Sequence, residues 1–288
     1  MTPTVEDAFS QCSELIKRAA KLIEGQISQI EEREHNTAFV SSWEAQRSAA
    51  VQIFRVRSLQ LYRDTLLFLA GQILDADWKH HYFLLPHVRT LLDIYARFIH
   101  LFERCEGFDK QALTCIAYQV ITVKTLNSEA AYQTTLMTVD QFLQKIGFAF
   151  PGFEDLKFSW IKNQNLHFAK RDELLTTENM KKYSTYTLDI FKPSNTYDIY
   201  SYLSEFMHGN PYYYNETPYN ERFWVASMTL STTAFLLELV DCHVLSRIQT
   251  RDFRVWLKDV EKNRTDFMQV WRARIKELRD SKLDLPAE

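Results

Sequence analysis

The sequence predicts an all-α protein, a multi-helix bundle with long N- and C-terminal helices. The first observation is composition, because the 288 residues include only 6 Gly and 7 Pro. Tight turns between strands use these two residues at their corners, so their scarcity favours long helices and excludes a Gly-rich phosphate loop or a Rossmann fold. The second observation is the recurrence of apolar side chains every three to four residues. The third is the lack of an internal repeat of roughly 33–47 residues, which favours a bundle over a helical solenoid.

Two long helices are expected in the first quarter of the chain. The first covers residues 4–35, and Gln26 is the one polar interruption of its apolar stripe. The stripe consists of Phe9, Cys12, Ile16, Ala19, Ile23 and Ile30. The second covers about 41–75 and is apolar on more than one side near Leu66–Ala70. This pattern predicts that the stretch from Leu66 to Ala70 is central in the bundle.

A third strong helix is expected over residues 87–104, where Pro86 is compatible with the first helical turn. Its inward side chains are predicted to be Val88, Leu91, Leu92, Tyr95, Phe98, Ile99 and Phe102. Further helices are expected at about 109–125, 128–146, 178–190, 195–208, 219–248 and 251–280. The last of these carries an imperfect seam of Phe253, Trp256, Val260, Phe267, Val270 and Trp271.

The pattern favours a single helical domain over residues 1–288. The clearest loop is Phe148–Phe153, which contains Pro151 and Gly152, and it places a candidate subdomain joint near 148–153. A net charge of −3 excludes a globally basic nucleic-acid binder. We find no basic region followed by an apolar core at the N-terminus and no apolar run near the ~18 residues of a membrane span. A cytoplasmic protein with no membrane partner is therefore expected.

The two ends of the chain carry opposite charge. Residues 1–35 hold four Lys/Arg against seven Asp/Glu, and residues 251–282 hold ten against six. Solvated helix faces are the simple explanation. Opposite charge also favours pairing of the terminal helices, either with each other or with a second subunit. We therefore expect a homo-oligomer that associates through its terminal helices.

The segment Tyr200–Pro211 is the most suggestive for chemistry. Ser204 and His208 are four residues apart, so they share one face of a helix, and Tyr202 lies further around it. A serine beside a histidine can act as a nucleophile with its base. The structural alternative is that His208, in the last turn before Gly209, bonds the free carbonyl groups at the helix end.

A second candidate is the pair Arg89 and Asp93, which are also four residues apart. A simple ion pair within one helix explains this spacing. The surrounding residues are apolar, however, and a buried arginine needs a carboxylate or a ligand anion. The histidines at positions 80, 81 and 87 match neither the HExxH spacing nor the Glu-x-x-His of di-iron bundles. No metal and no cofactor are expected, and the four cysteines, which lack metal-ligand spacing, are read as reduced thiols.

These two motifs together resemble a widespread bacterial family of helical proteins of unknown function that is distantly similar to the HEPN (higher eukaryote and prokaryote nucleotide-binding) superfamily. The residues that carry the resemblance are Arg89, Asp93, Tyr202, Ser204, His208 and Gly209. The likeness covers roughly residues 50–245, and the family more often has Glu at the position of Asp93. HEPN nucleases cut RNA without a metal, through an Arg-x(4–6)-His motif. No histidine here has that motif; the nearest is Lys162 ahead of His167.

The resemblance implies a cytoplasmic protein that acts on or senses RNA or nucleotides, in defence or toxin–antitoxin biology. Its site would combine Tyr202, Ser204 and His208 as catalytic residues with Arg89 and Asp93 as ligand-binding residues. The resemblance leaves metal-independent RNA cleavage as one candidate activity, although the Arg-x(4–6)-His motif is absent. The alternatives are a non-catalytic helical interaction or scaffold protein, in which the same residues form a structural polar network, and a sensor of a small anion bound to Arg89.

Overall fold

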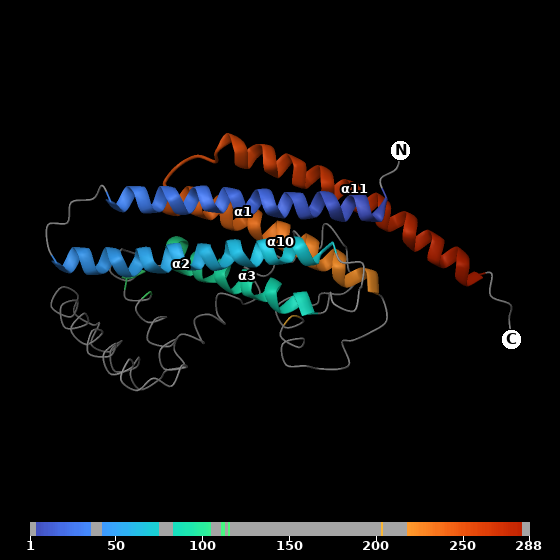
Figure 1. The fold of residues 1–288 in the computed structure, drawn as a ribbon, viewed down its shortest axis with the longest axis horizontal. Helices are drawn as coiled ribbons and strands as arrows, with labels where there is room; N and C mark the ends of the chain where they lie inside the picture. The colour runs from blue at the N-terminus through green and yellow to red at the C-terminus, as the bar shows by residue number, and fades with distance from the viewer. Residues whose placement is uncertain are drawn as a thin grey trace, which may run out of the picture. The chain divides into compact units, whose positions relative to one another are not determined.

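The computed structural model describes residues 4–35, 42–74, 83–104 and 218–283, together with positions 111, 112, 115 and 203. These residues are helical over nearly their whole length and contain no strand (Figure 1). The prediction of an all-α protein is confirmed for this part of the chain. The helices expected within 109–146 and 178–208 lie outside the described residues, apart from the four single positions.

The described helices begin and end within a few residues of their predicted bounds. They are α1 (Val5–His35), α2 (Ser42–Gln72), α3 (Leu85–Phe98), α10 (Pro218–Leu239) and α11 (Arg251–Leu283). Two of them continue as π-helices, α3 into Ile99–Arg104 and α10 into Val240–Val244. The long N- and C-terminal helices that the sequence predicts are therefore present.

The chain divides into two compact units. One comprises Met1–Gln26, Leu59–Tyr95 and Thr177–Glu288, and the other comprises Ile27–Ser58 and Ala96–Thr176. In the second unit, Phe98 packs against Phe54 and Phe102 with ring centroids 5.8 and 5.2 Å apart. The single-domain assignment stays a prediction, and the joint near 148–153 lies outside the described residues.

Threonine residues begin both terminal helices. At α1, the Thr4 hydroxyl accepts a hydrogen bond from the Asp7 amide, and the Asp7 carboxylate accepts bonds from the Thr4 amide and hydroxyl. These reciprocal bonds satisfy amide groups that have no partner within the helix, and they lower the pKa of Asp7. At α11, the Thr250 hydroxyl accepts a bond from the Phe253 amide. Local sequence therefore fixes where each terminal helix starts.

The terminal helices pair with each other in antiparallel orientation. The Trp256 indole donates to the Leu15 carbonyl over 2.8 Å, and the Asn263 amide donates to the Ala8 carbonyl over 3.3 Å. Trp256 and Asn263 are seven residues apart on α11, and their acceptors Leu15 and Ala8 are seven residues apart on α1. The acceptor number falls as the donor number rises, so the two helices are antiparallel. Figure 1 shows α11 following α1 in this way. The predicted pairing of the terminal helices is thus realised within one chain.

The apolar stripe predicted for α1 is buried, since all six of its residues are at most 2% exposed. In α2, by contrast, the expectation that Leu66–Ala70 is central is wrong for two of its five residues. Leu66, Leu69 and Ala70 are fully buried, whereas Leu67 and Phe68 are 49% and 43% exposed. The inner face of α2 packs in the bundle, and its outer face carries apolar side chains that are about half exposed.

Helix α10 is the most apolar described helix. Its stretch Val225–Val244 is long and apolar enough to cross a membrane by length and composition, and 78% of that window is buried within the structure. A core helix passes the same test, so this is weak support for a membrane span. Glu238 and Asp241 interrupt this stretch, so it does not stand out in the sequence as an unbroken apolar run.

Candidate functional site

Arg89 and Asp93 lie together on α3. Their Nε and Oδ2 atoms are 3.7 Å apart, and their side chains are 10% and 23% exposed. The two charged groups are close enough to form an ion pair, but they are too far apart for a hydrogen bond. The pair was predicted from the spacing of the two residues. It supplies the Arg89 guanidinium with a countercharge one helical turn away, which is what a charge on this apolar helix requires.

The catalytic candidates Tyr202, Ser204 and His208 lie outside the described residues. Within their segment only Leu203 is described, as a helical and fully buried residue. The convergence of Arg89 with His208 therefore stays a prediction. Among the described residues there is no group of three or more His, Cys, Asp or Glu that could hold a metal ion.

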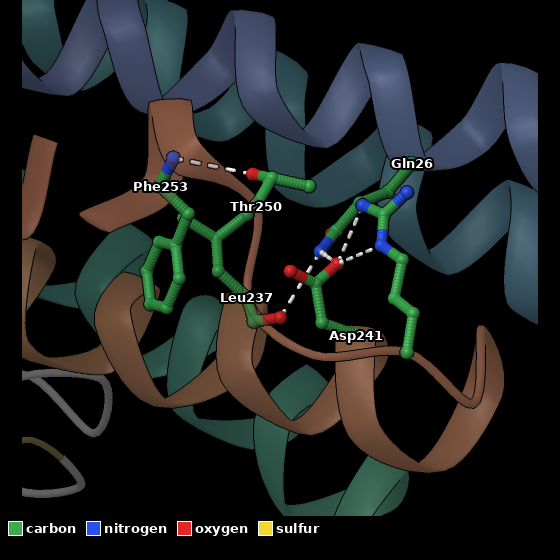
Figure 2. A network of polar contacts seen from close by, with 6 residues as sticks. Gln26, Leu237, Asp241, Thr250 and Phe253 are labelled. Atoms are coloured by element: carbon green, nitrogen blue, oxygen red, sulfur yellow. Dashed lines mark hydrogen bonds and ion pairs between the residues drawn. The ribbon is translucent and has the colours of Figure 1, made fainter. Parts of the chain in front are cut away.

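A polar network that the sequence did not predict lies where α10 leads into α11 (Figure 2). Asp241 is 1% exposed and sits in the π-helical end of α10. Its Oδ1 accepts hydrogen bonds from Gln26 Nε2 at 2.8 Å and from Arg247 Nη2 at 2.6 Å. Gln26 also donates to the Leu237 carbonyl at 3.0 Å. Gln26, the polar residue that interrupts the apolar stripe of α1, therefore contacts α10 and its π-helical end.

The backbone beside this network is unusual. The Leu245 amide bonds the Val240 carbonyl and the Arg247 amide bonds the Asp241 carbonyl. Ser246, between them, has a φ of 46°, a left-handed conformation that costs about 1 kcal/mol or more for a residue with a Cβ. The contacts of Asp241 with Arg247 hold this turn in place.

A second network joins the start of α1 to α10 and the end of α2. Arg222 is 5% exposed and forms two hydrogen bonds with the Glu6 carboxylate, at 2.9 and 3.0 Å. Its Nε donates to the Ile73 carbonyl at 2.8 Å. Its guanidinium lies 3.7 Å from the centre of the Phe9 ring, a cation–π contact. The N–H groups and one face of this buried arginine are thereby used.

Five buried side chains share one role in these contacts. Each donates a hydrogen bond to a main-chain carbonyl oxygen of another helix or its end. The donors are Ser13, Gln26, Arg222, Trp256 and Asn263, and the acceptors are Ala70, Leu237, Ile73, Leu15 and Ala8. Such a bond can form only when the two helices are at one particular shift along their axes. The five bonds together therefore fix the register of the helices.

A pocket of about 330 Å³ lies in the seam between α1 and α11. Arg18 and Asp259, which are among its lining residues, form an ion pair of 2.7 Å. Asn263 forms part of its wall and is 3% exposed. The lining holds two carboxylates, of Glu14 and Asp259, and two cations, so it has no net charge that would favour a polyanion such as RNA.

Comparison with known proteins gives no relative for this chain. No family model, no curated protein and no solved structure matches it.

Proposed function

We propose that this protein is a non-catalytic helical interaction protein, whose buried polar residues serve to fix the arrangement of its helices. The observation that carries the proposal is the set of five bonds from buried side chains to carbonyl oxygens of neighbouring helices. The donor atom of each of these five side chains is satisfied by the protein itself. The result is a rigid framework on which surface residues can be presented to a partner.

Arg89 and Asp93 fit this role. A phosphate-binding arginine has to reach its ligand, whereas the Arg89 side chain is 10% exposed and has the Asp93 carboxylate beside it. Under this proposal the pair contributes to stability. Breaking a buried pair by removing one partner costs about 3 kcal/mol, because the other charge stays buried. Asp93 is 23% exposed on its side chain, so we expect roughly 2 kcal/mol here.

The experiment is a double-mutant cycle measured by urea unfolding. Arg89→Met and Asp93→Asn should each lower the free energy of unfolding by about 2 kcal/mol, and the double variant should lose less than the sum. The matched control is Arg254→Met, which removes an exposed arginine of α11. Single variants as stable as wild type, combined with a loss of RNA binding, would overturn the proposal and favour a ligand site.

RNA or nucleotide binding is the second candidate function, and one observation favours it. Arg89 is oriented by a carboxylate on an otherwise apolar helix face, and an oriented guanidinium is a preferred phosphate ligand in proteins. This candidate requires that His208 or Tyr202 approach Arg89. It predicts that His208→Ala abolishes RNA handling without lowering the melting temperature.

A further inference from the structure

The pocket between α1 and α11 has the size of a small-molecule site. Its volume of about 330 Å³ is within the roughly 300–1,000 Å³ of such sites. Five described residues of α1 and three of α11 line it, and all eight belong to the same compact unit. A molecule held in this pocket therefore lies between the two terminal helices.

Asn263 brings a buried acceptor atom to the wall of this pocket. The residue is 3% exposed, and its Nδ2 donates to the Ala8 carbonyl at 3.3 Å and to Oε1 of Gln11, another lining residue, at 3.5 Å. A carbonyl can only accept, so the amide nitrogen faces Ala8 and Oδ1 occupies the other position. Oδ1 has no hydrogen-bond partner among the described residues. Since an unsatisfied buried acceptor is costly, a ligand that donates to Oδ1 is favoured.

Lys262 brings a positive charge to the same wall. The two lining carboxylates are already paired within the chain, Glu14 with Lys17 at 2.6 Å and Asp259 with Arg18 at 2.7 Å. Lys262 is exposed and forms no ion pair with any residue that the structure describes. The charge left for a ligand is therefore positive, and it favours a molecule with one negative group.

The α1 side of the pocket offers hydrogen-bond donors and one apolar residue. Ser10 and Gln11 are exposed lining residues that carry a hydroxyl and an amide N–H, and both groups can donate to a carboxylate. Leu15 is the apolar member of the eight lining residues. An apolar substituent on the ligand is therefore expected to lie on the α1 side.

We propose that this pocket binds a small carboxylic acid with a hydrogen-bond donor on the α-carbon and an apolar side chain, the chemistry shared by α-amino and α-hydroxy acids. The carboxylate pairs with Lys262, and the α-amino or α-hydroxyl group donates to Asn263 Oδ1. Lys262 and Asn263 are consecutive residues in one lining, which suits two groups that lie on neighbouring carbon atoms. This inference goes beyond the proposed function, because it adds a small-molecule site to the helical framework. By binding the folded state, the ligand also stabilises the pairing of α1 with α11.

The test uses three molecules with one carbon skeleton: L-leucine, L-2-hydroxy-4-methylpentanoate and 4-methylpentanoate. They carry an α-ammonium group, an α-hydroxyl group and no α-donor. Each is titrated into the full chain, and the dissociation constant is measured by saturation-transfer difference NMR. Leucine or its hydroxy analogue should bind at least about tenfold more tightly than 4-methylpentanoate, because only these two can donate to Asn263 Oδ1. The tighter of the two identifies the source of the ligand as amino acids or hydroxy acids.

Two variants assign the contacts. Lys262→Gln removes an exposed charge and should weaken binding of all three molecules by about tenfold, since all three have the carboxylate. Asn263→Leu removes the buried acceptor and should abolish the preference for an α-donor. The matched control is Lys258→Gln, at an exposed lysine of α11 outside the lining, which should bind like wild type. Circular dichroism checks the fold of each variant.

Three results would overturn this inference. They are no binding of leucine or its hydroxy analogue at millimolar concentration, equal affinity of wild type for all three molecules, and equal losses in Lys262→Gln and Lys258→Gln. The Lys262 variant keeps the inference testable if Asn263→Leu does not fold. None of these results affects the unfolding cycle of Arg89 and Asp93, which tests the proposed function separately.

Discussion

The indole nitrogen of Trp256 donates a hydrogen bond to the carbonyl oxygen of Leu15 over 2.8 Å, and this bond joins residues 241 positions apart in the chain. Trp256 is 1% exposed and Leu15 is 5% exposed. The Leu15 carbonyl lies within a helix, so it can accept this bond through its second lone pair. The contact fixes the register of the two terminal helices.

Two substitutions of Trp256 distinguish the contribution of its hydrogen bond to stability from the contribution of its apolar packing. Trp256→Phe should lower the free energy of unfolding by about 1 kcal/mol through loss of the bond, together with the smaller ring volume. Trp256→Ala should cost about 4 kcal/mol, because it also leaves a cavity. Urea unfolding measures both. A Trp256→Phe variant as stable as wild type would show that the indole nitrogen contributes nothing and that the register depends on apolar packing alone.

Asp241 is expected to be the most sensitive polar residue of the α10–α11 connection. In Asp241→Asn, the Arg247 guanidinium loses its charged partner. Because the Arg247 side chain is 23% exposed, we expect a loss of about 2 kcal/mol in the free energy of unfolding. Asp252→Asn is the matched control at an exposed aspartate, for which less than about 0.5 kcal/mol is expected. Comparable stability of the two variants would contradict the buried network.

The cysteines should differ in reactivity towards a thiol reagent such as iodoacetamide. Cys12 is fully buried, and burial raises the pKa of its thiol, so it should react only after unfolding. Cys242 is exposed. Desolvation, followed by the charges of Glu238 and Asp241, raises the pKa of Cys242, so its alkylation should be slow at neutral pH and faster as pH rises. Peptide mass spectrometry measures both rates; fast labelling of Cys12 in the native protein would contradict its burial in α1.

Stability should decrease on mild acidification because of His87. Its partial burial lowers the pKa of the imidazole below the ordinary 6.5. The folded state therefore binds the proton less readily than the unfolded state, so the contribution of His87 is complete above about pH 6.5 and is lost as pH falls below it. The free energy of unfolding should fall more between pH 7.5 and 5.5 in wild type than in His87→Gln. Parallel pH profiles would show that His87 is not responsible.

Much of the described fold follows from local pattern. The bounds of α1 and α11 are predictable because apolar spacing and threonine caps act within a few residues, and the buried stripe of α1 follows from the same spacing. The pair Arg89 and Asp93 is predictable for the same reason, since four residues along a helix bring side chains together.

The remaining contacts depend on how helices distant in sequence meet. In the sequence, Gln26 interrupts an apolar stripe and Asp241 is a charged residue in an apolar stretch. The hydrogen bond between them could not be predicted, because it forms only when α1 packs on α10. The outer face of α2 was misread because apolar content on all sides is the pattern of a buried helix. The same pattern arises in a helix that has one face in the core and another face available to a partner.

The account is tested most directly by incubating the purified protein with labelled single-stranded RNA, beside Arg89→Met and His208→Ala. A non-catalytic interaction protein should leave the RNA intact in all three samples and bind it no more tightly than the roughly 10⁻⁴–10⁻⁶ M range of non-specific binding. Cleavage of RNA by wild type that is lost in both variants, at unchanged melting temperature, would contradict the account.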